Sequence, residues 1–252
     1  MANERNRGPA ARNTREPDAR MRVRRWGQSA AAWTDRWPVH AAVLSGLLLT
    51  LSFPPFDQPW LQIPAWMLLL RLAGTSRTRR ELTIRVTAAM LVWNLGATYW
   101  LMMATVSGGV AAITANSLLM VLPWLVIRAV RRGKWALGWQ VPAIAGVWTA
   151  FEFGHHHWPL SWPWLTLANA WSVWPNAIQW IEWTGHLGVS FWVVSVAVLL
   201  ERAWAGSRGT FGMASGQPER ALQAEWVQPP EQVQKNRWRL AATCAPAAAL
   251  LA

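Results

Sequence analysis

Acidic and histidine side chains that could bind a metal or a substrate gather at the end of one long apolar segment. Glu152 is followed by three consecutive histidines at positions 155–157. Carboxylates and imidazoles are common zinc ligands, but consecutive histidines point in different directions and no second Glu-x-x-His pair occurs in the chain. We therefore predict no metal site and no cofactor. Glu152 is interpreted either as an ordinary carboxylate at the level of the lipid headgroups or as the partner of a substrate amine or headgroup.

The single cysteine, Cys244, is the other residue that could do covalent chemistry. A nucleophilic cysteine needs a neighbouring base, a lowered thiol pKa and access to solvent. Cys244 instead lies in an apolar run with no acidic residue, lysine or histidine near it in sequence. No Gly-x-Ser-x-Gly elbow or phosphate-binding loop occurs elsewhere. We predict an inert thiol, no disulfide framework and no catalytic residue in this sequence.

Long apolar runs dominate the chain that carries these residues. Hydrophobic residues make up 53% of it and charged residues only 14%, against roughly 25% charged residues in ordinary soluble domains. We predict an all-α, multi-pass transmembrane helix bundle of about six spans. A spanning helix needs about 20 residues, so the first two runs are marginal and could be tilted or re-entrant. The six runs are residues 39–53, 60–74, 86–104, 110–130, 135–153 and 187–204.

The remaining residues complete the predicted domain organisation around a bundle at residues 38–204. Residues 1–37 form an Arg-rich tail without apolar periodicity, which predicts disorder. Residues 205–239 are rich in Gly, Pro, Gln and Glu and predict a flexible loop. Residues 240–252 are apolar again, but at about 1.5 Å per residue they reach only about 20 Å of a roughly 30 Å hydrocarbon core. We interpret them as a truncated seventh span.

The distribution of basic residues predicts the orientation in the membrane. All 24 Lys and Arg lie in the tail or in the connections 71–85, 128–134 and 202–239, and the alternating connections hold none. Because basic residues stay on the cytoplasmic side during insertion, the tail and these connections are predicted to be cytoplasmic, in a multi-pass protein of the plasma (inner) membrane. A net charge of +12 is also typical of nucleic-acid-binding proteins. A basic tail beside anionic lipid explains the distribution better, so we predict no nucleic-acid partner.

The outward connection at residues 154–186 is unusually rich in tryptophan, with seven of them. Such a segment is expected to lie in the headgroup layer or to pack on the ends of the spans, with an interfacial helix over residues 176–183. A lipid-entry surface and an ordinary aromatic belt both fit this pattern. Transport is less favoured. An ion or proton relay needs ionisable residues inside the spans, whereas the polar residues there are mainly Asn94 and Asn116.

Three groups of short motifs follow one another over roughly residues 40–204. The first is L-S-F-P-P-F-D at 51–57, and the second is G-A-T-Y-W-L at 96–101 with Gly108 and Gly109 after it. The third comprises W-T-A-F-E-F at 148–153, L-S-W-P-W-L at 160–165 and Q-W-I-E-W-T-G at 179–185, followed by Gly188. In order and spacing, these motifs resemble the N-terminal membrane region of the bacterial apolipoprotein N-acyltransferase family.

The resemblance implies a bundle of membrane helices with an outward nitrilase-like catalytic domain inserted before the last helix. In that family, a cysteine of the soluble domain takes an acyl chain from a phospholipid and passes it to the α-amine of a diacylglyceryl-cysteine lipoprotein. The phospholipid acyl donor and the lipoprotein substrate are therefore the expected partners. The resemblance also implies which residues of this chain line or support the lipid-facing cavity. They are Phe53, Pro54, Phe56, Trp100, Glu152, Trp162, Pro163, Trp164 and Glu182.

The nitrilase-like domain, with the Glu, Lys and Cys that do the chemistry in that family, should begin after the seventh span and is missing from these residues. Cys244 is not its nucleophile, because it falls inside the span. We therefore expect the chain not to acylate on its own. Three expectations stay open: a truncated product, half of a split enzyme with a separate nitrilase-like chain, or a relative kept as a non-enzymatic lipid-binding or scaffolding membrane protein.

Overall fold

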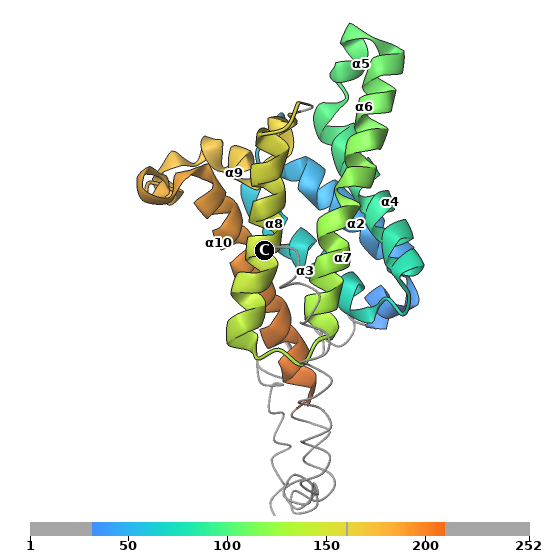
Figure 1. The fold of residues 1–252 in the computed structure, drawn as a ribbon, viewed down its shortest axis with the longest axis vertical. Coiled ribbons are helices and arrows are strands. Elements are labelled where there is room, and N and C mark those ends of the chain that lie inside the picture. The colour runs from blue at the N-terminus through green and yellow to red at the C-terminus, as the bar shows by residue number, and fades with distance from the viewer. Residues whose placement is uncertain (1–31, 160, 210–252) are drawn as a thin grey trace, which may run out of the picture. The chain divides into compact units, whose positions relative to one another are not determined.

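A computed structural model describes residues 32–159 and 161–209, and the regular elements in these residues are all helices (Figure 1). The predicted all-α class is thereby confirmed. The longer helices are α2 (Pro38–Ser52), α3 (Gln62–Thr75), α4 (Arg79–Thr98), α6 (Val106–Leu119), α7 (Val121–Arg132), α8 (Leu137–His156) and α10 (Ile181–Gly209). The short ones are α5 (Leu101–Ala104), α9 (Leu167–Ala170) and the 3-10 turns η1 (Pro59–Leu61), η2 (Pro163–Leu165), η3 (Trp171–Val173) and η4 (Pro175–Ala177). The described residues up to Ala205 form one compact unit, which contains the site described below.

Two stretches of helix among the described residues are long and apolar enough to cross a bilayer. They are Val106–Arg132, in which α6 runs into α7, and Ile181–Ala205 in α10. Helix α2 is apolar but has only 15 residues, or about 22 Å at 1.5 Å per residue. The count of about six spans therefore stays a prediction, as do the cytoplasmic N-terminus and the plasma-membrane location.

Helix α4 shows why the length of an apolar run underestimates the length of a helix. The run predicted a start near residue 86, but α4 begins at Arg79. Thr78 Oγ1 accepts a hydrogen bond from the backbone N–H of Glu81 at 3.1 Å, and the Glu81 carboxylate accepts one from the N–H of Arg77 at 2.6 Å. These bonds satisfy N–H groups that have no partner inside the helix. The helix therefore extends into charged residues that hydropathy does not detect.

Several predicted segments lie wholly or partly outside the described residues: the tail up to residue 31, the loop after residue 209 and the seventh span with Cys244. Two boundaries are wrong where they can be compared. Residues 32–36, assigned to a disordered tail, are helical, and Asp35 pairs with Arg71 at 2.5 Å. Helix α10 continues to Gly209, into the predicted flexible loop. An ion pair links the first segment to α3, and the second continues α10 although Gly206 and Gly209 are poor helix formers.

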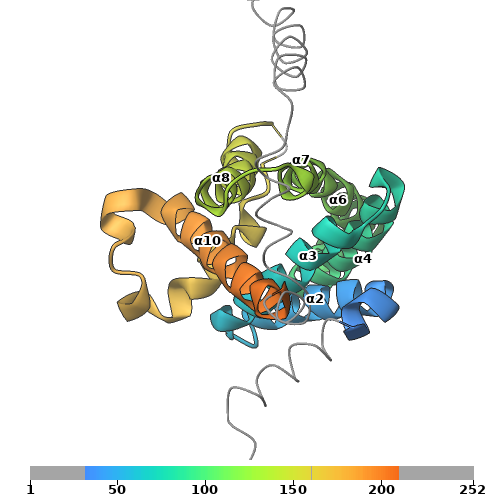
Figure 2. The same cartoon turned by 90° about the horizontal axis from the view of Figure 1, so that it is seen from below.

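Small residues bring α2 and α4 into close contact. Viewed along the bundle in Figure 2, the helices α2, α4, α6, α7 and α8 lie side by side in that order, and α10 is not a neighbour of α4. A Cβ added at Gly46 would collide with the backbone oxygen of Ala89, and one at Gly96 would collide with the side chain of Thr50. Thr50 Oγ1 also donates to the carbonyl of Val92 at 3.2 Å. Close approach through small residues is a common way for helices to associate in membranes.

Replacing Gly46 with leucine is expected to destabilise the bundle by about 1–3 kcal/mol, because the new side chain forces α2 away from the α4 backbone. The measurement is the thermal unfolding temperature of the purified chain in detergent. Gly138→Ala is the matched control, since a Cβ at Gly138 meets nothing within 4 Å. Equal unfolding temperatures for Gly46→Leu and the wild type would show that the two helices are not in contact there.

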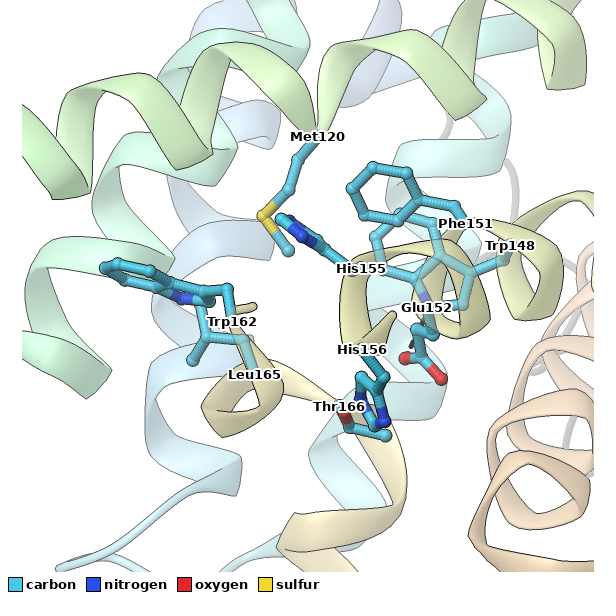
Figure 3. Close-up of a pocket in the computed structure, with 9 residues that line it drawn as sticks. All are labelled: Met120, Trp148, Phe151, Glu152, His155, His156, Trp162, Leu165 and Thr166. Atoms are coloured by element: carbon cyan, nitrogen blue, oxygen red, sulfur yellow. Dashed lines mark hydrogen bonds between the residues drawn. The ribbon is translucent and has the colours of Figure 1, made fainter. Parts of the chain in front are cut away.

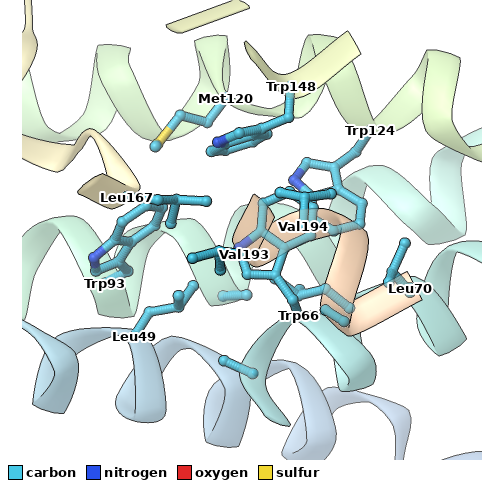
Figure 4. Packing of buried hydrophobic residues seen from close by; sticks show 14 of the residues in the cluster. Leu49, Trp66, Leu70, Trp93, Met120, Trp124, Trp148, Leu167, Val193 and Val194 are labelled. Atoms are coloured by element: carbon cyan, nitrogen blue, oxygen red, sulfur yellow. The ribbon is translucent and has the colours of Figure 1, made fainter. Parts of the chain in front are cut away.

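Tryptophan side chains fill the centre of the bundle as well as its edges. Trp66, Trp93, Trp124 and Trp148 are fully buried (Figure 4). The ring of Trp66 stacks on Trp124 with centroids 4.8 Å apart and meets Trp148 edge-on at 4.8 Å. This aromatic cluster joins α3, α7 and α8. The expectation that tryptophan lies at the membrane boundary therefore describes only some of the tryptophans, because indole rings also supply large apolar areas for packing.

Arginine side chains tie the helix ends together at the opposite end of the bundle from the Trp-rich segment. Arg132 Nη1 donates to the carbonyl of Ser76 at 2.7 Å, and Arg128 Nη2 donates to that of Arg77 at 2.8 Å. They satisfy carbonyl groups just beyond the C-terminus of α3. Arg131 pairs with Glu201 of α10. The connections 71–85 and 128–134 therefore meet at one end, as the alternation of basic residues predicts.

Candidate functional site

The Trp-rich segment after α8 folds back over the helix ends instead of extending away from them. Glu152 Oε1 accepts hydrogen bonds from Trp148 Nε1 at 2.8 Å and from the backbone N–H of Leu167 at 3.0 Å. Gln62 Nε2 donates to the carbonyl of Leu167 at 3.0 Å, and Gln62 Oε1 accepts from Trp171 Nε1 at 2.9 Å. The polar groups involved are buried. These bonds hold the segment in one position on the ends of α3 and α8.

A cavity of about 590 Å³ lies where this segment meets α5 and α6. That volume is within the usual range of small-molecule sites. The lining is mostly apolar, with Asn116, Ser161 and His155 as its polar members, and no charged residue contributes to it when His155 is neutral. The lining residues are Leu101, Ala112, Ala115, Asn116, Leu119, His155, Trp158, Pro159, Ser161, Trp162 and Trp164. Such a cavity suits a flexible apolar chain that carries one weakly polar group.

Three tryptophans in contact with one another lie at this cavity, and two of them, Trp162 and Trp164, line it. Trp100 is 41% exposed and Trp164 44% exposed. Their rings meet edge-on with centroids 5.6 Å apart. Trp164 in turn meets the partly buried Trp162 at 5.3 Å and 90°. We call Trp100, Trp162 and Trp164 the tryptophan gate.

A smaller pocket adjoins the cavity and shares His155 and Trp162 with it (Figure 3). Its volume is about 10 Å³, close to the least that holds one water molecule. In Figure 3, the His155 ring lies beside Met120, and Glu152 lies between Trp148 and His156. Glu152 is 4% exposed, so its carboxylate is covered by the chain itself and is not an openly solvated group at a helix end. The carboxylate is internal because it accepts hydrogen bonds from the folded-back segment.

A hydrogen-bonded chain of polar side chains crosses from α4 to α8 behind the cavity. Asn116 Nδ2 donates to Asn94 Oδ1 at 2.7 Å, and His155 Nε2 lies 2.8 Å from Asn116 Oδ1. All three residues are buried. The sequence showed Asn94 and Asn116 as isolated polar residues, and nothing in it indicated that they join a histidine.

The other histidines make local contacts. The rings of His156 and His186 stack with centroids 5.0 Å apart, and His156 Nε2 lies 2.8 Å from Thr166 Oγ1. In residues 32–159 and 161–209, no three His, Cys, Asp or Glu side chains are grouped so that they could hold a metal ion.

The structure brings together only part of the set that the family resemblance implied. Trp162 and Trp164 line the cavity, Trp100 contacts Trp164, and Pro163 begins η2 between the two lining tryptophans. Glu152 lines the smaller pocket.

The other four residues of that set contribute to neither lining. Phe53 is a core residue against Trp93, with ring centroids 5.8 Å apart. Pro54 and Phe56 are exposed on the turn after α2, and Glu182 is exposed near the start of α10.

Sequence reasoning missed the residues that α6 contributes. Ala112, Ala115 and Leu119 lie on one side of that helix, spaced by three and four residues, and line the cavity. This spacing is the available signal, because small residues three to four positions apart leave space beside a helix. The predicted helix over residues 176–183 is also wrong. η4 ends at Ala177, and α10 begins at Ile181 with a break at Gly185, where φ is 68°.

Comparisons with known proteins agree with the motifs. Residues 45–199, more than half of the chain, match the family model described as apolipoprotein N-acyltransferase N-terminal domain. Apolipoprotein N-acyltransferase of Chlorobaculum tepidum is 31% identical over 166 residues, which cover 65% of this chain and 31% of that protein. The chain thus spans about a third of the length of this curated relative. No solved structure matches this chain. The chain belongs to the apolipoprotein N-acyltransferase family, through the N-terminal domain of that family.

Proposed function

We propose that this chain forms the membrane-embedded part of an apolipoprotein N-acyltransferase and holds the acyl chain of a phospholipid donor. The observation that supports this most directly is the apolar cavity of about 590 Å³ behind the tryptophan gate, within the residues that match the family domain. An acyl chain gains free energy by leaving headgroups and water for such a lining. Trp100 and Trp164, being half-exposed indoles, suit the boundary between headgroups and hydrocarbon.

The proposed membrane arrangement is the one that the basic residues predict. The helices cross the plasma membrane, the arginine-rich end faces the cytoplasm, and the tryptophan gate opens toward the outer leaflet. The gate and the arginine contacts lie at opposite helix ends, which supports this arrangement.

Acyl transfer would also need a nucleophile and a base, which we propose come from a nitrilase-like domain on the same or a separate chain. By this proposal, residues 1–252 alone bind lipid without acylating, and the lipoprotein substrate meets the acyl group on the outer side. The alternative is a non-enzymatic lipid-binding or scaffolding role. An acylation assay with a lipoprotein peptide, run with and without a nitrilase-like partner, separates the two. Activity from residues 1–252 alone would contradict the proposal.

Filling the cavity tests the lipid-binding part directly. Ala115→Trp is expected to reduce cross-linking of a photoactivatable phospholipid acyl chain to the cavity residues by about fivefold or more, because an indole takes up much of the space. The yield is measured by mass spectrometry of labelled peptides in lipid nanodiscs. Ala111→Trp on the same helix is the matched control, because Ala111 is exposed and outside the lining. Equal labelling of wild type and Ala115→Trp would show that the acyl chain lies elsewhere.

A further inference from the structure

Two guanidinium groups at the arginine-rich end of the bundle converge on the same pair of backbone oxygens. Arg128 Nη2 donates to the carbonyls of Ser76 and Arg77 at 3.3 and 2.8 Å. Arg132 Nη1 donates to the same two carbonyls at 2.7 and 3.3 Å. Because both nitrogens bond the Ser76 oxygen, they lie at most 6.0 Å apart. We call Arg128 and Arg132 the arginine pair. Their positive charges repel each other at this separation, and the carbonyl dipoles supply no full counter-charge.

The carboxylates at this end of the bundle are bonded to other arginines. Within residues 32–159 and 161–209, neither member of the arginine pair belongs to an ion pair. The charge of Glu81 reaches Arg128, but one Glu81 oxygen already binds Arg85 and the other binds the backbone N–H of Arg77. The ion pairs of this end are Arg71 with Asp35, Arg85 with Glu81, and Arg131 with Glu201.

Further positive charge surrounds the arginine pair. Arg79 is exposed at the start of α4 and lies near enough to Arg128 for the two charges to repel each other. The connections 71–85 and 128–134 together hold nine basic residues and one acidic residue, Glu81. Such a surface attracts an anion and repels a ligand that brings its own cation.

The arginine pair has hydrogen-bond donors to spare. Arg128 donates through Nη2 and Arg132 through Nη1, and the second terminal nitrogen of each group makes no hydrogen bond within the described part of the chain. The Arg132 side chain is exposed. In Arg128, only Nε is both buried and unpartnered, so Nη1 reaches the surface. Guanidinium N–H groups of this kind bind phosphate oxygens.

An exposed apolar side of α7 leads to the arginine pair. Leu122 is 54% exposed and Val126 49% exposed, and Ala129 is exposed one turn further on. Steps of four, three and three residues from Leu122 to Arg132 place these residues along one side of the helix. The same helix belongs to a stretch long enough to cross a bilayer, Val106–Arg132. We call Leu122, Val126 and Ala129 the α7 stripe. Apolar surface beside a phosphate-binding group favours a lipid over a water-soluble phosphate.

We propose that the arginine pair binds the phosphate of an anionic phospholipid, such as a phosphatidylglycerol, whose acyl chains lie along the α7 stripe. A zwitterionic headgroup is disfavoured, because its ammonium group would lie among arginines that lack a counter-charge. The bound phosphate relieves the repulsion within the arginine pair. This inference rests on the proposed membrane-spanning arrangement, in which this end faces the cytoplasm, but not on the acyl-chain site behind the tryptophan gate.

The test compares two lipids that share acyl chains and differ in the headgroup. Phosphatidylglycerol and phosphatidylcholine, each with a photoactivatable group at the same acyl position, are added at equal low mole fraction to phosphatidylcholine nanodiscs that hold the full chain. Mass spectrometry measures the labelling of peptides that cover the α7 stripe. For the wild type, phosphatidylglycerol is expected to label these peptides about fivefold or more over phosphatidylcholine. Arg128→Gln with Arg132→Gln should bring this ratio close to one, whereas Arg128→Lys with Arg132→Lys should keep most of it.

Arg36→Gln with Arg80→Gln is the matched control, because both residues are exposed and the double variant removes the same charge outside the arginine pair. It should keep the labelling ratio of the wild type. Equal labelling of the wild type by the two lipids would overturn the inference, and this comparison needs no variant to fold. An equal fall of the ratio in the control and in the glutamine pair would also overturn it, because the preference would then belong to the whole basic surface.

Two further arms identify the ligand and keep the two proposals apart. Glycerophosphoglycerol, the headgroup without acyl chains, is added at the concentration of the labelled lipid and should leave the ratio unchanged. Loss of the ratio would show that a water-soluble phosphate is the ligand and would overturn the lipid assignment. Ala115→Trp should also leave the ratio unchanged, since it alters the labelling of the cavity residues alone. The acyl-chain site and the anionic-lipid site therefore fail independently.

Discussion

Replacing Arg131 with methionine is expected to lower the free energy of unfolding by about 3–5 kcal/mol. Arg131 Nη1 and Nη2 donate to the two carboxylate oxygens of Glu201 at 2.7 and 2.9 Å, which links the end of α7 to α10. The side chains are 6% and 2% exposed. Without Arg131, a buried carboxylate loses its partner and must remain unpaired or take up a proton. Chemical unfolding in mixed micelles, followed by circular dichroism, measures the loss.

The double variant Arg131→Met with Glu201→Leu separates the ion pair from simple packing. Replacing both partners removes the unpaired charge, so much of the stability lost in the single variant should return. Arg132→Met is the control on the same turn. Arg132 is exposed and only caps α3, so about 1 kcal/mol is expected. If Arg131→Met is no less stable than Arg132→Met, Glu201 is accessible to water.

Hydropathy and charge predicted the helical class and the gathering of basic connections at one end, because these follow from composition along the chain. They did not predict helix ends set by specific hydrogen bonds. The bonds among Arg77, Thr78 and Glu81 extend α4 into charged residues, and the contact of Asp35 with Arg71 orders a segment that composition assigns to a tail. Both effects depend on individual atoms, to which an average over a window of residues is insensitive.

The candidate site was predictable only where neighbouring residues in the sequence also lie together in space. Trp162, Pro163 and Trp164 are adjacent in the chain and remain together at the cavity. The contact of Asn94 with Asn116 and His155 joins three helices whose relative rotation no local pattern fixes. The burial of Glu152 has the same origin. A carboxylate at a helix end is ordinarily solvated, and only the folded-back segment covers it.

Glu152→Leu is expected to destabilise the segment over the cavity by about 2–4 kcal/mol. It leaves two buried donors, Trp148 Nε1–H and the backbone N–H of Leu167, without the acceptor they share, and each unsatisfied group costs about 1–3 kcal/mol. Faster hydrogen exchange at Leu167, relative to the core of α7, measures this loosening. Because the same segment carries Trp162 and Trp164, retention of the acyl-chain probe should fall with it.

Glu152→Gln distinguishes between the two interpretations of this carboxylate. Glutamine keeps an oxygen acceptor at the same position, so exchange at Leu167 and probe retention should stay close to those of the wild type if Glu152 positions the segment. If the negative charge instead binds a substrate amine or headgroup, the glutamine variant would fold normally and yet lose as much substrate affinity as the leucine variant. The contacts of Glu152 Oε1 favour the positioning role, because both donors belong to the chain itself. A glutamine variant that keeps slow exchange at Leu167 but loses binding of an aminolipid would reverse this assignment.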